Sequence, residues 1–241
     1  MNSYKKKLHP KDVQVVILAG GAGTRLKPIT EKLTKVMIGV SGKPFLDHQF
    51  NYLKKAGFRR FLLLISYLGN QIEDYFKDGE RFGIEISYSY EREPCGTGGA
   101  LKLAIAKLED RFVLINGDTF YPLDYNDFLS NAAQIETGGM IAAYDNHDKI
   151  ATNNLKVEID NNISKYSKKQ YTKDMNGLDG GVAFFFKCVV NLIPEGEKVS
   201  FEEEIFPVLI NRKELKAYLT NIRYYDMGTF ERLDIIRNVI Q

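Results

Sequence analysis

Short apolar runs alternate with polar segments along the chain and predict buried strands. The first run, residues 13–18, is rich in Val and Ile, and similar runs occupy 61–65 and 112–115. Apolar runs of this length are typical of strands that are covered on both faces. Over 84–90, apolar and polar residues alternate one by one, which predicts a strand with one exposed face.

A helical pattern lies between the first two of these strands. Pro44 suits the first helical position, and Gly57 predicts the end of the helix. Between them, Leu46, Phe50 and Leu53 form a one-sided apolar face. Because strands and helices continue to alternate, we predict an α/β core with a largely parallel sheet.

Capping residues and apolar patterns mark further helices. Asn70 can cap a short helix that ends at Phe76, and Thr229 can cap a last helix that runs to Ile240. Ser200 and Glu203 form a capping box, so we interpret the glutamates at 202–204 as cap and solvent groups rather than catalysts. Helices are also expected from 100 to 108 and over 124–136.

The alternation of strand and helix stops after residue 144. Residues 145–154 are polar and predict a loop, whereas 155–159 alternate as a strand that turns at 160–162 and returns over 163–166. This hairpin predicts a small β-rich excursion over about 145–180 that covers one side of a ligand site. The whole chain, 1–241, is expected to form a single domain, with the lysine-rich residues 1–12 as a loose leader.

Composition excludes several other classes of protein. Of the 241 residues 44% are hydrophobic, and the net charge of +2 is too balanced to indicate nucleic acid or a membrane surface as partner. No apolar run is long enough to span a bilayer, and the leader lacks the apolar centre of a signal peptide. Cys95 and Cys188 lie far apart without paired histidines, so we expect a reducing cytoplasm and neither a zinc site nor a disulfide.

A glycine-rich basic loop follows the first predicted strand. It contains Gly20, Gly21 and Gly23 and ends at Thr24 and Arg25. Glycines let the backbone approach a ligand closely, and successive N–H groups can face phosphate oxygens, so the loop predicts an anion site. It is neither a Walker A loop nor a complete dinucleotide fingerprint. Taken alone, the glycines would also suit a tight turn after a strand.

Two carboxylates follow predicted strands. Asp118 comes after the run at 112–115, behind Asn116 and Gly117, and Asp226 follows a strand expected at 222–225. A carboxylate beyond the carboxyl end of a buried parallel strand lies where α/β sheets place their ligands, although an ordinary Asx turn would also suit Asp118. Two such carboxylates with a basic glycine loop predict a Mg²⁺–nucleotide site, because Mg²⁺ prefers oxygen ligands and also binds phosphates.

Taken together, these segments resemble the signature motifs of the sugar-1-phosphate nucleotidyltransferases. The matching motifs are Leu-Ala-Gly-Gly-Ala-Gly-Thr-Arg at 18–25 followed by Lys35, Pro-Cys-Gly-Thr-Gly-Gly-Ala at 94–100, Asn-Gly-Asp at 116–118 and Asp-Met-Gly-Thr at 226–229. The resemblance extends from Val13 to about Leu233. It implies the fold of nucleotide-diphospho-sugar transferases, a Rossmann-like three-layer αβα sandwich with a mixed, mostly parallel sheet.

The resemblance also implies functions for individual residues. Arg25, Lys35 and Asp118 would be catalytic, and Asp118 and Asp226 would bind Mg²⁺. Gly96 and Thr97 would lie beside the base of the nucleotide. The complete set of residues that would bind substrate is Leu18, Ala19, Gly20, Gly21, Gly23, Thr24, Gly96, Thr97, Asn116, Lys165, Asp179 and Gly180.

This chain departs from the family pattern at several positions. Thr34 and Val36 replace the prolines that usually flank the lysine of the first motif. Asp179 replaces an asparagine that touches sugar hydroxyls in the family, which keeps an acceptor and loses a donor. For the lysine that contacts the sugar phosphate we select Lys165, although runs of lysine are usually solvated. Two further lysines compete with it, Lys168 and Lys169.

The resemblance implies an enzyme that transfers a nucleoside monophosphate from a nucleoside triphosphate to a sugar 1-phosphate, giving an NDP-sugar and pyrophosphate. Within the family the chain is most similar to D-glycero-D-manno-heptose 1-phosphate guanylyltransferases, which implies GTP and this heptose phosphate as substrates for the synthesis of a surface polysaccharide. Thymidylyl-, uridylyl- and cytidylyltransferases share most of these residues, and a non-catalytic sugar-nucleotide sensor could have the same fold. The sequence leaves the base, the sugar and the oligomeric state open.

Overall fold

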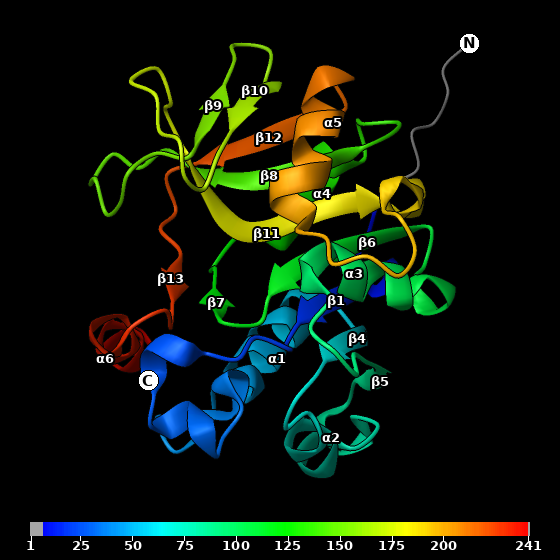
Figure 1. The fold of residues 1–241 in the computed structure, drawn as a ribbon, viewed down its shortest axis with the longest axis vertical. Coiled ribbons are helices and arrows are strands. Elements are labelled where there is room, and N and C mark those ends of the chain that lie inside the picture. The colour runs from blue at the N-terminus through cyan, green and yellow to red at the C-terminus, as the bar shows by residue number, and fades with distance from the viewer. Residues whose placement is uncertain (1–6, 241) are drawn as a thin grey trace.

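The computed structural model describes residues 7–240, which fold around one mixed sheet (Figure 1). The order of its seven strands is β12-β8-β11-β6-β1-β4-β5. β11 is antiparallel to both of its neighbours, and the other four pairs are parallel, so the prediction of a mixed, mostly parallel sheet is confirmed. In chain order these strands are β1 (Gln14–Leu18), β4 (Arg60–Ile65), β5 (Glu85–Tyr90), β6 (Arg111–Asn116), β8 (Gly139–Tyr144), β11 (Leu178–Phe186) and β12 (Leu215–Thr220).

Three small two-stranded sheets lie outside the main sheet. The predicted hairpin is confirmed: β9 (Leu155–Val157) and β10 (Ile163–Tyr166) pair antiparallel beyond β12 (Figure 1). β2 (Gly39–Val40) pairs with β3 (Lys43–Pro44). The third pair joins segments more than a hundred residues apart, β7 (Thr119–Phe120) and β13 (Tyr225–Asp226).

Helices cover both faces of the main sheet, which gives the predicted three layers. One apolar cluster joins the sheet to α1 (Phe45–Ala56), α2 (Asn70–Phe76) and α4 (Tyr125–Ala132). A second cluster joins the opposite face to α3 (Gly96–Leu103) and α5 (Phe206–Asn211). Neighbouring residues of β1 belong to different clusters, because successive side chains of a strand point to opposite faces.

A third, smaller cluster packs beneath the last helix, α6 (Phe230–Val239). Leu233 and Ile236 of α6 lie in it together with Leu26 and Ile38, which follow the glycine-rich loop. The end of the chain therefore packs against the segment that follows β1 (Figure 1).

The N-terminal segment is packed from residue 8 onward. Leu8 is 5% exposed and belongs to the first cluster, and Pro10 is buried in a short 3₁₀ turn. The prediction of a loose leader over 1–12 is therefore wrong for residues 8–12, because two apolar side chains anchor the segment to the core. Residues 1–6 lie outside the described part of the chain.

Helix ends agree with the predictions to within a few residues. Gly57, with a φ of 112°, ends α1, and the hydroxyl of Thr229 accepts the Arg232 N–H at the start of α6. Asn70 is the first residue of α2 rather than its cap, and Pro44 immediately precedes α1. α4 ends at Ala132 instead of continuing to 136.

The predicted capping box at Ser200 is shifted by one residue. The Ser200 hydroxyl accepts the N–H of Glu203, as expected, at 3.2 Å. The side chain that reaches back to the Ser200 N–H is that of Glu204, at 2.7 Å. The reason is that Phe201–Ile205 form a π-helical turn, which is one residue wider than an α-helical turn. Within residues 7–240, no helix combines the length and the apolar character needed to cross a bilayer.

Candidate active site

A cavity of about 320 Å³ opens at the carboxyl ends of β1 and β6. It lies where parallel sheets commonly bind their ligands, and it brings together side chains from distant parts of the chain. Its lining residues are Leu18, Gly21, Gly23, Thr24, Arg25, Lys35, Val36, Thr97, Asn116, Gly117, Asp118, Lys168, Glu202 and Gly228. All three residues predicted to be catalytic, Arg25, Lys35 and Asp118, are among them.

The glycine-rich loop forms one wall of this cavity. Gly23 has a φ of +59°, and its carbonyl accepts a hydrogen bond of 2.9 Å from the Thr30 hydroxyl. The carbonyl of Gly20 accepts a hydrogen bond of 2.7 Å from the Ser66 hydroxyl. The loop is thus held from two sides in a conformation that a side chain at 23 would strain. Of the residues predicted here, Ala19 and Gly20 do not line the cavity.

Two cations face the cavity from the segment that follows β1. Arg25 lies in a 3₁₀ turn and is exposed, whereas Lys35 is only 9% exposed. The Lys35 ammonium forms a short ion pair with the Asp118 carboxylate. A buried charge needs such a partner, and the pair keeps the lysine at the cavity wall.

Asp118 stands on a tight turn that follows β6. The Gly117 N–H donates to the Leu18 carbonyl at 3.0 Å, so the turn lies directly on the end of β1. A Cβ at position 117 would lie 2.5 Å from that carbonyl oxygen, a contact that real side chains do not make. Only glycine fits there, and the Asp118 side chain, 32% exposed, projects into the cavity.

Asp226 reaches the same region through the small β7–β13 sheet. It pairs with Thr119, the residue after Asp118, and the Met227 N–H donates to the Asp118 carbonyl at 3.0 Å. Its carboxylate accepts hydrogen bonds from the Arg232 guanidinium and the Gly228 N–H, each at 2.7 Å. The bond to Asp226 raises the pKa of Arg232. Asp118 and Asp226 are thus carried by adjacent, hydrogen-bonded segments.

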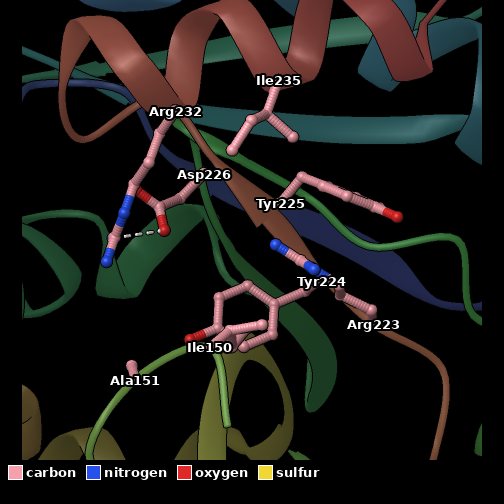
Figure 2. A pocket seen from close by; sticks show the side chains of 8 residues that line it. All are labelled: Ile150, Ala151, Arg223, Tyr224, Tyr225, Asp226, Arg232 and Ile235. Carbon is pink, nitrogen blue, oxygen red and sulfur yellow. Dashed lines mark hydrogen bonds and ion pairs between the residues drawn. The ribbon is translucent and has the colours of Figure 1, made fainter. Parts of the chain in front are cut away.

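Asp226 itself lines not this cavity but a second pocket, of about 130 Å³. Figure 2 shows the paired side chains of Arg232 and Asp226 at one end and the ring of Tyr224 beside Ile150 at the other. Asp226 lines this pocket, whereas Gly228, two residues later, lines the cavity.

The small-residue motif at 94–100, a loop that passes into α3 at Gly96, is hydrogen-bonded to the segment around Val199. The Gly98 N–H donates to the Val199 carbonyl, and the Val199 N–H donates to the Cys95 carbonyl, both at 2.9 Å. A Cβ on Gly96, whose φ is +77°, would lie 2.4 Å from the Val199 oxygen. Thr97 lines the cavity and Gly96 does not. Several backbone groups of this loop are therefore already paired within the protein.

Glu202 is a cavity residue that the sequence analysis missed. It is 7% exposed, and its carboxylate accepts a hydrogen bond of 2.7 Å from the Thr97 hydroxyl. The interpretation of 202–204 as cap and solvent groups is wrong for Glu202, although it holds for Glu204. The partner Thr97 lies 105 residues away in the sequence, so no spacing rule could reveal the contact.

Among the competing lysines, the structure brings Lys168 and not Lys165 to the cavity. Lys168 lies 3.5 Å from the Glu202 carboxylate, whereas Lys169 pairs with Glu203 at 3.0 Å. Lys165 pairs instead with Asp174 at 2.8 Å, and this ammonium lowers the pKa of Asp174 to about 2. The loop after β10, part of the predicted excursion, thus reaches the cavity through Lys168.

Asp179 and Gly180 do not line the cavity either. The Asp179 carboxylate accepts hydrogen bonds from the Tyr166 hydroxyl at 3.1 Å and from the Gly181 N–H at 2.9 Å. Removal from water raises the pKa of this carboxyl group. A Cβ at Gly180 would lie 2.1 Å from the Tyr121 ring, so packing against that ring requires a glycine. Contact of these two residues with substrate stays a prediction.

The two aspartates suit a divalent cation whose remaining ligands come from substrate phosphates. No group of three or more His, Cys, Asp or Glu side chains within residues 7–240 is arranged to hold a metal ion. Mg²⁺, however, is commonly bound by one or two carboxylates together with substrate phosphates. Asp118 and Asp226 provide two such oxygen donors beside a cationic cavity.

Comparisons with known proteins agree with this geometry. Residues 14–239 match the family model described as "Nucleotidyl transferase". The chain is 37% identical to a D-glycero-α-D-manno-heptose 1-phosphate guanylyltransferase of Campylobacter jejuni over 85% of this chain and 89% of that one. It is 32% identical to a mannose-1-phosphate guanylyltransferase of Mycobacterium tuberculosis over 93% of this chain and 63% of that one.

A solved structure is similar over nearly the whole fold. HddC from Yersinia pseudotuberculosis, crystallised in complex with GMP-PN, superposes with a TM-score of 0.78 at 30% identity. The match covers 95% of this chain and all of that one. The predicted Rossmann-like fold is confirmed.

If the cavity binds phosphates, removing a cationic side chain that lines it should weaken phosphate binding. Removing a cationic side chain that lies outside it should not. Arg25→Ala should raise the Kd for inorganic tripolyphosphate by about 10-fold or more, because a charge-assisted hydrogen bond contributes about 1.5–3 kcal/mol. Lys165→Ala removes the same charge outside the cavity and should change the Kd by less than about twofold. Isothermal titration calorimetry measures both, and equal losses in the two variants would contradict a specific phosphate site.

Proposed function

We propose that this chain, which belongs to the nucleotidyl transferase family, transfers a nucleoside monophosphate from a nucleoside triphosphate to a sugar 1-phosphate and releases pyrophosphate. The observation that carries the proposal is the meeting of Arg25, Lys35 and Asp118 at one cavity, with Asp226 on the adjoining segment. The best-supported substrates are GTP and D-glycero-α-D-manno-heptose 1-phosphate, the pair implied by the name of the Campylobacter jejuni relative.

The reaction needs no nucleophile from the protein. An oxygen of the sugar phosphate attacks the α-phosphorus of the nucleotide, and the bond between that phosphorus and the oxygen bridging to the β-phosphate breaks. The electron pair of this bond leaves with pyrophosphate. Among the described residues that line the cavity there is no Ser-His or Cys-His pair, the commonest arrangement for a protein nucleophile. Catalysis then consists of placing two anionic substrates in line and stabilising the charge that develops.

Arg25 and Lys35 would supply most of the positive charge from the protein. Both project into the cavity beside the backbone of the glycine-rich loop, whose N–H groups suit phosphate oxygens. The three N–H donors of the Lys35 ammonium allow it to bind a phosphate oxygen while it stays close to Asp118. These groups would hold the triphosphate without discriminating between bases.

Asp118 and Asp226 would hold a Mg²⁺ ion. When bound, such an ion neutralises phosphate charge and orients the two phosphates that react. Arg232 pairs with Asp226 and Lys35 pairs with Asp118, so each carboxylate is held in position by a cation. Together they place two anionic oxygens next to the cationic side of the cavity.

On the acceptor side we propose Lys168, not Lys165, as the lysine for the sugar phosphate. Lys168 lines the cavity, and its pairing with the buried Glu202 fixes its direction. Glu202 in turn is bound to Thr97.

Because the relatives named for guanylyl transfer differ in their sugar, guanine as the base is better supported than heptose as the sugar. We place the reaction in the cytoplasm, in agreement with two cysteines that are free thiols.

Loss of either presumed metal carboxylate should abolish turnover without unfolding the protein. Asp118→Asn and Asp226→Asn should each lower kcat on the order of 1000-fold, because a charge that stabilises the transition state is removed. Asp174→Asn removes an exposed carboxylate that pairs with Lys165 outside the cavity, and it serves as the matched control. Pyrophosphate release at saturating Mg²⁺ measures all three, and near-normal turnover of an Asn variant would exclude that residue from the metal site.

GTP should be the preferred nucleotide. A wrong base leaves hydrogen-bonding groups of the site unpaired, at about 1–3 kcal/mol each, so GTP should lead by roughly 10-fold or more in kcat/KM. The test compares GTP, ATP, CTP, UTP and dTTP at one fixed heptose 1-phosphate concentration. A preference for CTP, UTP or dTTP would refute guanylyl transfer but not nucleotidyl transfer. Inactivity with all five, and also with mannose and glucose 1-phosphates, would favour a sugar-nucleotide sensor.

The three lysines after β10 should differ in their effect on the acceptor. Lys168→Ala should raise the KM for the sugar 1-phosphate by about 10-fold, since it removes a charged donor from the cavity. Lys165→Ala and Lys169→Ala remove cations that pair with Asp174 and Glu203 outside it, and they should stay within about twofold of the wild type. Steady-state kinetics at saturating GTP distinguish the three, and a larger effect of Lys165→Ala would restore the first assignment.

A further inference from the structure

A buried glutamine lies beneath the turn that carries Asp118. Gln49 belongs to α1 and is 3% exposed. Its Nε2 group donates one hydrogen bond to the Asn116 carbonyl, at 3.3 Å, and a second, short one to the Thr119 carbonyl. These two carbonyls stand on either side of Gly117 and Asp118. Because both partners are acceptors, the amide must present its nitrogen and not its oxygen to the turn.

The two hydrogen bonds complete the attachment of this turn to the rest of the fold. The Gly117 N–H is bound to Leu18 of β1, and the Asp118 carbonyl is bound to Met227 beyond β13. Gln49 adds a third attachment, because it joins the carbonyls of Asn116 and Thr119 to α1. Without it, the carbonyl of Thr119 would lose a buried partner, and the turn would lose its attachment to α1.

The same glutamine also acts on the second carboxylate through Thr119. Thr119 is 4% exposed, and it pairs with Asp226 across the β7–β13 sheet. A shift of the Thr119 backbone would therefore move Asp118 along the chain and Asp226 across the sheet. Gln49 forms no hydrogen bond with either carboxylate, yet it contacts a residue that is adjacent to Asp118 in sequence and pairs with Asp226.

An unpaired oxygen indicates that this amide is retained for its donors. The Oε1 atom of Gln49 is buried and has no hydrogen-bond partner among the described residues. Burial of an unpaired amide oxygen is unfavourable, and an apolar side chain of the same size would avoid it. The position nevertheless holds a glutamine, whose two N–H bonds reach the Asp118 turn.

We infer that Gln49 is a positioning residue that fixes the distance between Asp118 and Asp226 and so sets the affinity of the site for a divalent cation. The inference rests on the proposed function, because it takes these two aspartates to be the metal ligands. Groups that orient metal ligands typically affect metal affinity or activity about 10- to 100-fold.

The test compares two glutamine-to-methionine variants. Gln49 contacts the turn at the carboxyl end of β6, and Gln14 lies at the amino end of β1. Gln49→Met keeps the length of the side chain and removes both N–H donors. Gln14→Met makes the same change at the amino end of β1, where a glutamine that is 6% exposed donates to the Lys107 carbonyl at 3.0 Å and accepts the Glu109 N–H at 3.1 Å. Each variant loses two hydrogen bonds between a buried side chain and the backbone, so both should lower Tm to a similar extent.

Only Gln49→Met should affect the metal site. We expect its Kd for Mn²⁺, measured by electron paramagnetic resonance with GTP bound, to rise about 10-fold or more, and kcat to fall by a similar factor. The KM for GTP should change by less than about threefold, because the phosphate loop is untouched. Gln14→Met should match the wild type in Mn²⁺ affinity and kcat.

Three outcomes would overturn the inference. Wild-type Mn²⁺ affinity and kcat in Gln49→Met would show that the turn does not need its donors, and equal losses in Gln14→Met would reduce the effect to general destabilisation. A wild-type protein that releases no pyrophosphate with any nucleotide would refute the proposed function and the inference with it. Should Gln49→Met fail to fold, Gln49→Asn replaces it: this variant keeps an amide that is too short to reach both carbonyls, and the same loss of Mn²⁺ affinity is expected.

Discussion

The contact between Gly117 and the end of β1 is the constraint on which the rest of the site depends. The Gly117 N–H is bound to the Leu18 carbonyl, and a Cβ would approach that oxygen to 2.5 Å. Since β1 also opens into the glycine-rich loop, this contact sets the distance between the phosphate side of the cavity and Asp118. The β7–β13 pairing then carries the same placement to Asp226. The positions of the glycine-rich loop, the Asp118 turn and the Asp226 segment therefore depend on one close backbone contact and on the small β7–β13 sheet.

Charge around the cavity is arranged in pairs whose members come from different elements. Lys35 pairs with Asp118, Lys168 with Glu202, and Arg232 with Asp226. Such pairing gives a lysine that is 9% exposed and a glutamate that is 7% exposed a partner of opposite charge in the absence of a ligand. A nucleotide with its divalent cation brings both signs of charge, so it can interact with the acidic and the basic member of a pair at once. The site is thus prepared for this class of ligand without leaving isolated buried charges.

The parts of the site that the sequence predicted are those that depend on local geometry. Gly21, Gly23 and Arg25 follow the end of β1 within a few positions, and Gly117 and Asp118 directly follow β6. Parallel strands bring such ends to one edge of the sheet. Glu202 and Gln49 could not be found in this way, because their partners lie 105 and about 70 residues distant and are selected by packing. Lys165 shows the same limit: three lysines within five positions look equivalent in sequence. Only the course of the loop after β10 separates Lys168 from its neighbours.

The groups proposed for the two substrates lie on different kinds of segment. The groups proposed for the triphosphate and its cation lie on the segment after β1 and on the turn after β6, and the pair Lys35–Asp118 joins these two segments beside the paired strands β1 and β6. The groups proposed for the acceptor lie on a loop of the excursion and on a π-helical turn, joined to each other by Lys168–Glu202 and to the 94–100 loop by Thr97. A change in the length of the loop after β10 would move Lys168, whereas the buried turn of Glu202 and the phosphate side would stay in place. The architecture therefore allows the acceptor to vary without loss of nucleotidyl transfer, which agrees with relatives that share guanylyl transfer but carry the names of different sugars.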